Sequence, residues 1–360
     1  MSVSREEPRT PMSVSREEPR TPMSVSREEP RTPMSVSREE LSKRLQRVLA
    51  PMLGADVSVE HLVALSGGAS RATLAFTART RDAARPLILR TGPPDNTRAG
   101  MELEARVQAR AAAAGAPVPR VLVATDSAER LGAPFLICDA VGGETVPRRI
   151  LRGIDDDGRA RLLRQCAHAL ATIHRADPDV PGLVQRDELA RTRALLDGMA
   201  DTTATFEWAF RRLAVNRPDP SPPRLVHGDF RMGNLIIDGA RLAAVLDWEL
   251  VHIGEIYEDL AWFCIRAWRF GAPAARGAGG LGSIESFLST YEQVAGTTVD
   301  RVSFRWWLVM ATLRWGVICR YQAERHLSGQ TPSVELATIG RRVAETEWDI
   351  LDLLETRSVA

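Results

Sequence analysis

One short window of the chain combines a histidine, two aspartates and an asparagine at a spacing that suits phosphoryl transfer. It begins His227-Gly-Asp229-Phe-Arg-Met-Gly-Asn234, and Asp247 follows after a further apolar run. In this order, the first aspartate orients an attacking hydroxyl group, while the asparagine and the second aspartate hold Mg²⁺ against the phosphates of ATP. We therefore predict that Asp229 and Asn234 are catalytic and that Asn234 and Asp247 bind the metal ion.

The elements around these residues are predicted to bring them together. Residues 235–237 and 242–246 are short apolar runs, and Asp238-Gly239 between them is a strong turn signal. A β-hairpin places its two open ends side by side, so Asn234 and Asp247 should meet there. Oxygen-bearing side chains that converge at such a point suit a hard cation. The alternative, a solvated hairpin with scattered polar residues, leaves the rest of the pattern unexplained.

The composition narrows the class of protein. A chain of 360 residues is long enough for two lobes with sizeable cores. The charges nearly cancel, with 47 basic and 46 acidic residues, so neither nucleic acid nor a membrane is an expected partner. The cysteines are widely spaced and include no Cys-x-x-Cys pair, which argues against a disulfide framework or a zinc site and indicates a cytoplasmic protein.

The scarcity of lysine bears on mechanism, because Lys43 is the only lysine in the chain. A step that kinases assign to lysine must here be performed by another residue. Arg90 ends a predicted strand, and residues 98–114 form a predicted helix that carries Glu102 and Glu104. A strand-end cation paired with a helix glutamate fixes ATP phosphates in kinases. We expect Arg90 to pair with Glu104, with Glu102 as the alternative, although either could be a solvated helix charge.

Two further segments are candidates for nucleotide binding. Ser66, Gly67, Gly68 and Ser70 form a small-residue loop between two predicted strands. The backbone N–H groups of such a loop can approach phosphates closely, although an ordinary hairpin turn would have the same composition. Residues 139–143 loosen the chain after another predicted strand, where the backbone of Asp139 and Val141 could bond an adenine edge.

The chain divides into regions of different character. Residues 1–33 repeat an eleven-residue polar unit with two prolines, which opposes regular structure. We interpret residues 1–36 as a disordered tail produced by a coding duplication or a start-site artefact, with a binding tail as the alternative. Residues 37–139 are the predicted N-lobe, 140–144 a hinge, and 145–360 a C-lobe dominated by helical patterns.

Together these residues resemble the aminoglycoside phosphotransferase/choline kinase family. The resemblance runs from about residue 57 to 355 and is nearest to the small-molecule kinase branch that includes kinase-like domains fused to acyl-CoA dehydrogenases. It rests chiefly on Leu65-Ser-Gly-Gly-Ala-Ser70, Leu89-Arg90, His227-Gly-Asp-Phe-Arg-Met-Gly-Asn234, and Leu246-Asp-Trp-Glu-Leu250 with the following Glu258-Asp259.

The resemblance implies an α+β, bilobal, protein-kinase-like fold, with a small β-rich N-lobe, a larger helical C-lobe, and ATP and Mg²⁺ between them. It assigns Asp229 as the catalytic aspartate and Asn234 and Asp247 as metal ligands. His227 and Asp259 would brace the catalytic loop. Arg90 stands where the family often has a lysine.

The expected function is transfer of the γ-phosphate of ATP to a hydroxyl of a small molecule. The alternative is a catalytically weak pseudokinase that acts as a nucleotide-binding or scaffold module, supported only by the missing lysine. Two hints about the acceptor conflict. Five acidic residues could attract an aminoglycoside-like polycation, namely Asp187, Glu188, Asp197, Asp201 and Glu207. Three arginines hint at an anionic, hydroxyacyl-CoA-like acceptor, unless they are solvated surface residues: Arg266, Arg269 and Arg276.

Overall fold

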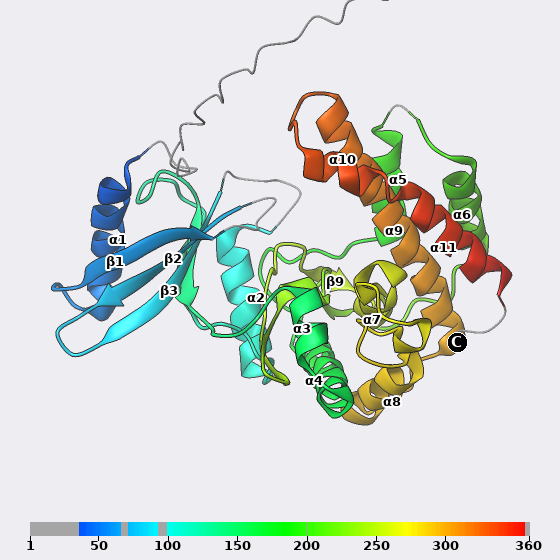
Figure 1. Cartoon of the computed structure of the whole chain (residues 1–360), viewed down its shortest axis with the longest axis horizontal. Coiled ribbons are helices and arrows are strands. Elements are labelled where there is room, and N and C mark those ends of the chain that lie inside the picture. Colours follow the sequence, from blue (N-terminus) through cyan, green and yellow to red (C-terminus); the bar gives the residue numbers. More distant parts are fainter. Residues whose placement is uncertain (1–35, 66–70, 93–98, 200, 357–360) are drawn as a thin grey trace, which may run out of the picture.

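The computed structural model describes residues 36–65, 71–92, 99–199 and 201–356. The expectations for residues 1–35 and for the loop residues Ser66, Gly67, Gly68 and Ser70 lie outside these ranges. Within them the chain forms two lobes, a sheet-rich N-lobe on the left of Figure 1 and a helical C-lobe on the right. The α+β, two-lobed architecture that the sequence predicts is confirmed.

The N-lobe is built on a five-stranded antiparallel sheet in the order β1-β2-β3-β5-β4. Its strands are β1 (Ser58–Leu65), β2 (Ala72–Arg79), β3 (Ala84–Thr91), β4 (Val121–Thr125) and β5 (Phe135–Asp139). Along β3, Leu87 and Leu89 are fully buried in the N-lobe core, whereas Arg90 points to the other face. This period-two alternation turns Arg90 away from the core, so that its guanidinium is free to meet other charged groups.

Two helices accompany this sheet: α1 (Arg38–Leu53) and α2 (Met101–Ala113). Helix α1 begins directly after Ser37, whose side chain accepts the backbone N–H of Glu40 at 3.2 Å and so caps the helix. Its stripe of Leu41, Leu45 and Leu49 is buried against the sheet. Helix α2 lies between the sheet and the C-lobe in Figure 1 and carries both candidate glutamates.

The C-lobe is built around α9, a helix of 27 residues that contacts α5, α6, α7, α10 and α11. Its helices are α3 (Pro147–Gly153), α4 (Asp156–Arg175), α5 (Glu188–Asp197), α6 (Ala204–Val215), α7 (Ile256–Cys264), α8 (Ile284–Ala295), α9 (Arg301–Leu327), α10 (Val334–Gly340) and α11 (Val343–Glu355). Short 3₁₀ turns are η1 (Met232–Asn234), η2 (Arg266–Arg269) and η3 (Ala274–Arg276). In the described ranges no helix is both long enough and apolar enough to cross a bilayer.

Two strand pairs hold the predicted catalytic window. Strand β6 (Arg224–Val226) pairs with β9 (His252–Gly254), and β7 (Leu235–Asp238) pairs with β8 (Arg241–Val245). The β7–β8 turn contains Gly239 at φ 61°. The backbone N–H of Leu246 donates to the carbonyl of Asn234 at 2.8 Å, which closes the mouth of this hairpin. The predicted hairpin is therefore confirmed, and it brings the segments that carry Asn234 and Asp247 together.

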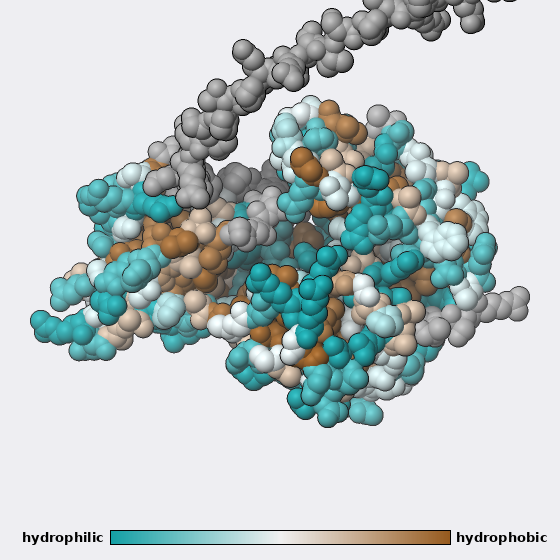
Figure 2. Space-filling view, in the orientation of Figure 1, coloured by the Kyte–Doolittle hydropathy of each residue, from teal (hydrophilic) through white to brown (hydrophobic). Residues whose placement is uncertain are grey.

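The segment between β5 and α3 connects the lobes and contains the predicted hinge, residues 140–144. Glu144 exchanges two backbone hydrogen bonds with Ile237 of the catalytic hairpin, at 2.8 and 3.0 Å. Gly143 lies against the same strand, since a Cβ there would fall 2.6 Å from the side chain of Ile236. The connection is thus anchored to the hairpin that carries the site. The visible face of the molecule is hollowed between the sheet and the helices (Figure 2).

Candidate active site

The carboxylate of Asp229 is held by three side-chain donors. Trp262 Nε1 donates to it at 2.7 Å, Arg231 Nε at 3.0 Å and Asn234 Nδ2 at 2.7 Å. The Asp229 side chain is only 14% exposed, so these bonds form with little competition from water. Asp229 is therefore fixed in orientation, as a residue that aligns a reacting hydroxyl must be.

Asp259 holds the loop that carries Asp229. The family resemblance implies this bracing role for both Asp259 and His227. The two oxygens of the buried Asp259 carboxylate accept the backbone N–H groups of His227 and Gly228 at 2.7 and 2.8 Å. His174 adds a bond at 3.1 Å. Burial acts to raise the pKa of Asp259, but the bonds and charges of His174 and His227 outweigh it, so the pKa is lowered. His227 also bonds the carbonyl of Leu246 at 3.0 Å, which ties the loop to β8.

Two residues of the site have backbone in the left-handed region. Gly228 has φ 83°, and a Cβ there would lie 2.7 Å from the carbonyl oxygen of Leu250. Both the backbone conformation and the close packing therefore require glycine at this position. Asp247 has φ 66° although it is not glycine. This conformation is unfavourable by about 1–2 kcal/mol for such a residue and is typical of functional sites held by their surroundings.

Arg90 joins the two lobes across this site. Its guanidinium bonds Glu104 of α2 at 3.0 Å and Asp247 at 2.7 Å. Burial acts to lower the pKa of Arg90, but Glu104, Asp247 and Glu249 together raise it, so the side chain stays positively charged. The expected Arg90–Glu104 pair is present in the structure, although a role in binding phosphate is still a prediction.

Of the two candidate glutamates, Glu104 is the one that enters the site. Its side chain is fully buried, and burial raises its pKa against the opposing effect of Arg90 and Arg71. Glu102 is half-buried and accepts the backbone N–H of Asp126 at 3.2 Å instead of pairing with Arg90. The alternative that favours Glu102 is therefore wrong.

Four further residues shape the site without having been predicted from the sequence: Arg71, Arg231, Glu249 and Trp262. Arg71 bonds the second oxygen of Glu104 and lies 3.7 Å from Glu249. Its position directly after the small-residue loop is a signal that could have pointed to it. Arg231 lies inside the catalytic motif, but a single arginine has no distinctive pattern, and its contact with Asp229 becomes visible only in three dimensions.

The expected adenine-binding residues are only partly available. The carboxylate of Asp139 accepts two bonds from Arg85, at 2.6 and 2.9 Å, and its backbone N–H donates to the carbonyl of Arg120 at 3.0 Å. The Asp139 side chain is thus occupied within the sheet. Val141 lies in the connection between β5 and α3, so its contribution, through the backbone, is still a prediction.

The acidic residues that could attract a polycation are all engaged by arginines. The ion pairs are Asp187–Arg217, Glu188–Arg314, Asp197–Arg193, Glu207–Arg193 and Asp201–Arg320. Two of the three arginines that hinted at an anion are engaged as well, Arg266 with Asp349 and Arg276 with Asp156, both at 2.8 Å. The third, Arg269, is partly buried, and its Nε has no hydrogen-bond acceptor among the described residues.

A cleft of about 780 Å³ lies between η2, α9 and α11. Arg148, Arg269, Phe270, Thr312, Arg342 and Asp349 are among its lining residues. It connects to the catalytic loop through stacked side chains, because Arg231 lies over the ring of Trp268 at 4.9 Å and Trp268 stacks with Phe270 at 6.2 Å. The volume lies within the range of small-molecule pockets.

The donor atoms at the hairpin mouth fit a magnesium ion. The side-chain nitrogen of Asn234 is used by Asp229, which leaves the amide oxygen as the atom for a cation. Asp247 bonds Arg90 through one carboxylate oxygen, and its side chain is 32% exposed. Amide and carboxylate oxygens are ligands that Mg²⁺ prefers.

The fold and these side chains define a phosphotransferase of the kinase-like class. Residues 61–297 match the profile of the phosphotransferase enzyme family, and the chain belongs to that family. It is therefore an enzyme that transfers a phosphoryl group to a hydroxyl.

Curated relatives share part of their length with this chain. Acyl-CoA dehydrogenase family member 10 of Mus musculus is 27% identical over 295 residues, which are 75% of this chain and 27% of the relative. The human family member 11 is 24% identical over 283 residues, or 72% of this chain and 36% of the relative. The chain thus spans about a third or less of these proteins. An aminoglycoside 3'-phosphotransferase of Niallia circulans is 25% identical over 40% of this chain and 56% of its own.

Solved structures share the fold. A choline/ethanolamine kinase family protein of Mesorhizobium loti matches with a TM-score of 0.60 at 19% identity, covering 88% of this chain and 96% of its own. A thermostable mutant of the aminoglycoside phosphotransferase APH(4)-Ia, in a ternary complex with AMP-PNP and hygromycin B, matches with a TM-score of 0.55 at 21% identity, covering 86% and 97%.

Proposed function

We propose that this enzyme transfers the γ-phosphoryl group of ATP to a hydroxyl of a small molecule in a magnesium-dependent reaction. The observation that carries the proposal is the meeting of Asp229, Asn234 and Asp247 at one loop and hairpin, with Arg90 and Glu104 reaching them from the other lobe. The fold shared with a structure that holds AMP-PNP supports ATP as the donor.

In this proposal Asp229 accepts the hydrogen bond of the acceptor hydroxyl and aligns its oxygen with the γ-phosphorus. Trp262 donates to Oδ1 of the carboxylate and Asn234 donates to Oδ2. The Nε of Arg231 also donates to Oδ1. A carboxylate has about four acceptor sites, so an incoming hydroxyl competes with Arg231. We therefore expect Arg231 to move off Asp229, along the face of Trp268, when the acceptor binds.

Arg90 contacts the phosphates in the place of a lysine. Its planar guanidinium presents several N–H groups, and the structure uses one nitrogen for Glu104 and another for Asp247. Asn234 and Asp247 would hold Mg²⁺, which when bound offsets the negative charge of the phosphates. Most of the rate enhancement would come from positioning and from these fixed charges.

The charges around the site support an acceptor that is not a polycation. Each acidic residue proposed to attract an aminoglycoside is paired with an arginine, so no acidic surface remains for this purpose among those five residues. The cleft is lined by four arginines and three acidic residues, and this slight excess of positive charge favours a neutral or anionic acceptor such as a hydroxyacyl-CoA-like metabolite. The names of the curated relatives agree with an acyl-type acceptor.

The test is a screen in which the full chain, with MgATP, is given hydroxylated metabolites of three classes: cationic, neutral and anionic. Mass spectrometry identifies the phosphorylated product. We expect transfer to at least one class, and Asp247→Ala should abolish transfer and weaken MgATP binding. Unchanged turnover in Asp247→Ala would contradict the metal assignment.

The alternative of a catalytically weak nucleotide-binding module is not favoured, because the side chains of Asp229, Asn234 and Asp247 are all present and held in place. MgATP binding by the wild type without transfer to any acceptor would revive it.

The four cysteines are buried free thiols, which supports the expected reducing, cytoplasmic compartment.

A further inference from the structure

A buried arginine lies directly beneath the catalytic loop. Arg314, in the middle of α9, has a side chain only 8% exposed. Its Nη2 donates to the carbonyl of Gly228 at 2.9 Å, and its guanidinium lies 4.5 Å from the centre of the Trp262 ring. Gly228 directly precedes Asp229, and Trp262 donates to the Asp229 carboxylate. Arg314 therefore reaches the catalytic carboxylate by two routes, one through the backbone and one through a side chain.

The charge of Arg314 is compensated by a buried acidic cluster. Glu188 Oε2 lies 3.4 Å from Arg314 Nε and has no hydrogen-bond donor among the described residues. Burial acts to raise the pKa of Glu188, but Arg314 and Arg191 outweigh it, so the pKa is lowered. Glu188 thus stays ionised, and it lies beside Arg314 Nε, whereas Arg314 Nη2 bonds the catalytic loop.

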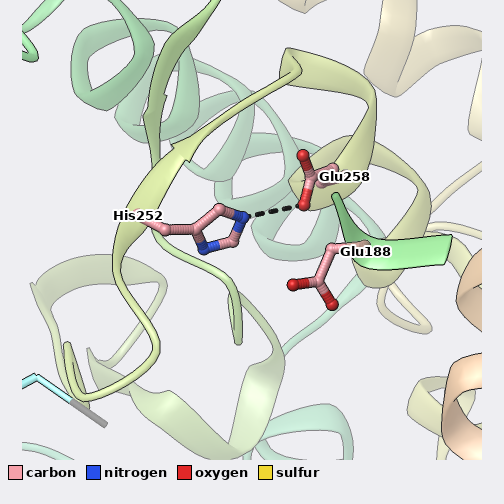
Figure 3. Close-up of side chains that lie close together, drawn as sticks. All are labelled: Glu188, His252 and Glu258. Carbon is pink, nitrogen blue, oxygen red and sulfur yellow. Dashed lines mark hydrogen bonds and ion pairs between the residues drawn. The ribbon is translucent and has the colours of Figure 1, made fainter. Parts of the chain in front are cut away.

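The same cluster does not suit a metal ion. Glu188, His252 and Glu258 converge from α5, β9 and α7, as Figure 3 shows. Both ring nitrogens of His252 are engaged, one with Glu258 at 2.9 Å and the other with the carbonyl of Leu250 at 2.8 Å. With Arg314 already beside Glu188, the positive charge that the acids require is present.

We propose that Arg314 is a positioning residue for phosphoryl transfer, which holds the Gly228 carbonyl and the Trp262 ring so that the indole N–H is aimed at Asp229. The inference rests on the proposed function. A guanidinium can donate in its plane to Gly228 and face Glu188 while its flat surface covers an aromatic ring. Lysine has one compact charge and cannot make all three contacts, so the geometry requires arginine in particular.

The first test compares Arg314→Lys with wild type. The substitution keeps the positive charge beside Glu188, so the fold should survive, with MgATP affinity within about threefold. Turnover should fall by about tenfold to a hundredfold, because a small displacement of a catalytic group has effects of that size. Arg301→Lys is the matched control: it lies on the same helix and pairs with Glu285 and Glu292 at 2.6 and 2.8 Å, remote from the loop.

The second test asks whether Arg314 acts through Trp262. In the Trp262→Phe background, which already lacks the indole donor, Arg314→Lys should reduce turnover by less than about threefold. Equal effects in both backgrounds would overturn the coupling to Trp262.

A third measurement does not depend on turnover. The ¹⁵N–¹H resonance of the Trp262 indole, assigned with Trp262→Phe, should shift in Arg314→Lys and not in Arg301→Lys. An unshifted resonance would overturn the proposal. If the wild type neither binds MgATP nor transfers phosphate, the proposed function fails, while the indole resonance still decides whether Arg314 positions Trp262.

Discussion

At the scale of single residues, the site is organised by arginine where lysine would be expected. Arg90 is shared between Glu104 and Asp247, and Arg71 takes the second oxygen of Glu104. Two arginines therefore face three carboxylates, those of Glu104, Asp247 and Glu249. The excess of negative charge raises the pKa of Arg90 and leaves capacity for a divalent cation at Asp247.

The first prediction concerns Arg90. Arg90→Ala should lower kcat/KM for MgATP by about a hundredfold, because a fixed donor to the phosphates is lost and Asp247 loses its partner. Arg90→Lys should lower it by about tenfold, since one ammonium group cannot hold both carboxylates and a phosphate. Steady-state kinetics measure both. Arg79→Ala, which breaks the exposed N-lobe pair with Glu60, is the control and should change neither value. An unaffected Arg90→Ala would remove Arg90 from the site.

At the scale of elements, a few backbone conformations align the catalytic loop with the hairpin. Gly228 permits the tight turn before Asp229, and the Leu246–Asn234 hydrogen bond closes the hairpin. Gly254 leaves room for the Glu258 carboxylate that caps α7, because a Cβ at position 254 would collide with it. The capping box of Glu255 and Glu258 then forms a regular start for α7 directly after this glycine.

A pair of glycine substitutions tests this requirement. Gly228→Ala forces a Cβ against Leu250 at positive φ, so it should destabilise the protein by about 2–3 kcal/mol and lower kcat. Gly239→Ala has a similar φ, but nothing lies within 4 Å of the added Cβ, so about 1 kcal/mol is expected with kcat retained. Urea unfolding and steady-state kinetics measure both. Equal effects of the two substitutions would show that close packing at Gly228 is unimportant.

The junction of β9 and α7 predicts a dependence on pH. Burial acts to lower the pKa of His252, but the hydrogen bond and charge of Glu258, with a contribution from Glu188, raise it above 6.5. A raised pKa stabilises the fold below the unfolded value and loses that effect as the pH rises through the folded value. The stability difference between wild type and His252→Gln should therefore be largest near pH 6 and shrink towards about pH 9. Urea unfolding across this range measures it, with exposed His168→Gln as the control. A difference that grows with pH would contradict the account.

Much of this arrangement can be predicted from sequence, because the relevant signals are local. The apolar runs and Asp238-Gly239 indicate the β7–β8 hairpin, and strand alternation explains why Arg90 leaves the core. The contacts of Arg71, Arg231 and Trp262 could not be predicted, since each joins residues far apart in the chain or depends on side-chain orientation. Four of the five pairings between these acidic residues and arginines were equally inaccessible, because they join residues far apart in the chain, whereas Arg193 and Asp197 have the i,i+4 spacing of helix neighbours.

At the scale of the whole molecule, the site exists only where the lobes meet. Arg90 and Glu104 come from the N-lobe, whereas Asp229, Asn234 and Asp247 come from the C-lobe. The N-lobe sheet and α1 have a core of their own, whereas Val107 and Ala111 of α2 pack into the C-lobe core, and the Arg90–Asp247 pair adds a polar contact between the lobes. A ligand that engages both sets of residues should therefore stabilise the whole molecule.

This predicts a metal-dependent thermal shift. MgATP at a hundred times its Kd should add about 2.7 kcal/mol to the free energy of unfolding and raise Tm, because the ligand binds only the folded protein. Removing Mg²⁺ with EDTA should abolish most of the shift, and Asp247→Ala should show little shift in either case. Differential scanning fluorimetry measures it. A full shift with ATP and EDTA would contradict the magnesium assignment.

The central claim is tested most directly by Asp229→Asn, compared with wild type for MgATP binding and for phosphoryl transfer to an acceptor found in the metabolite screen. Asparagine preserves the size of the side chain but removes the charge that orients the hydroxyl. The account predicts MgATP affinity within about threefold of wild type and transfer reduced by at least about a thousandfold. Transfer at a rate near that of the wild type would contradict the assignment of Asp229 and, with it, the proposed site.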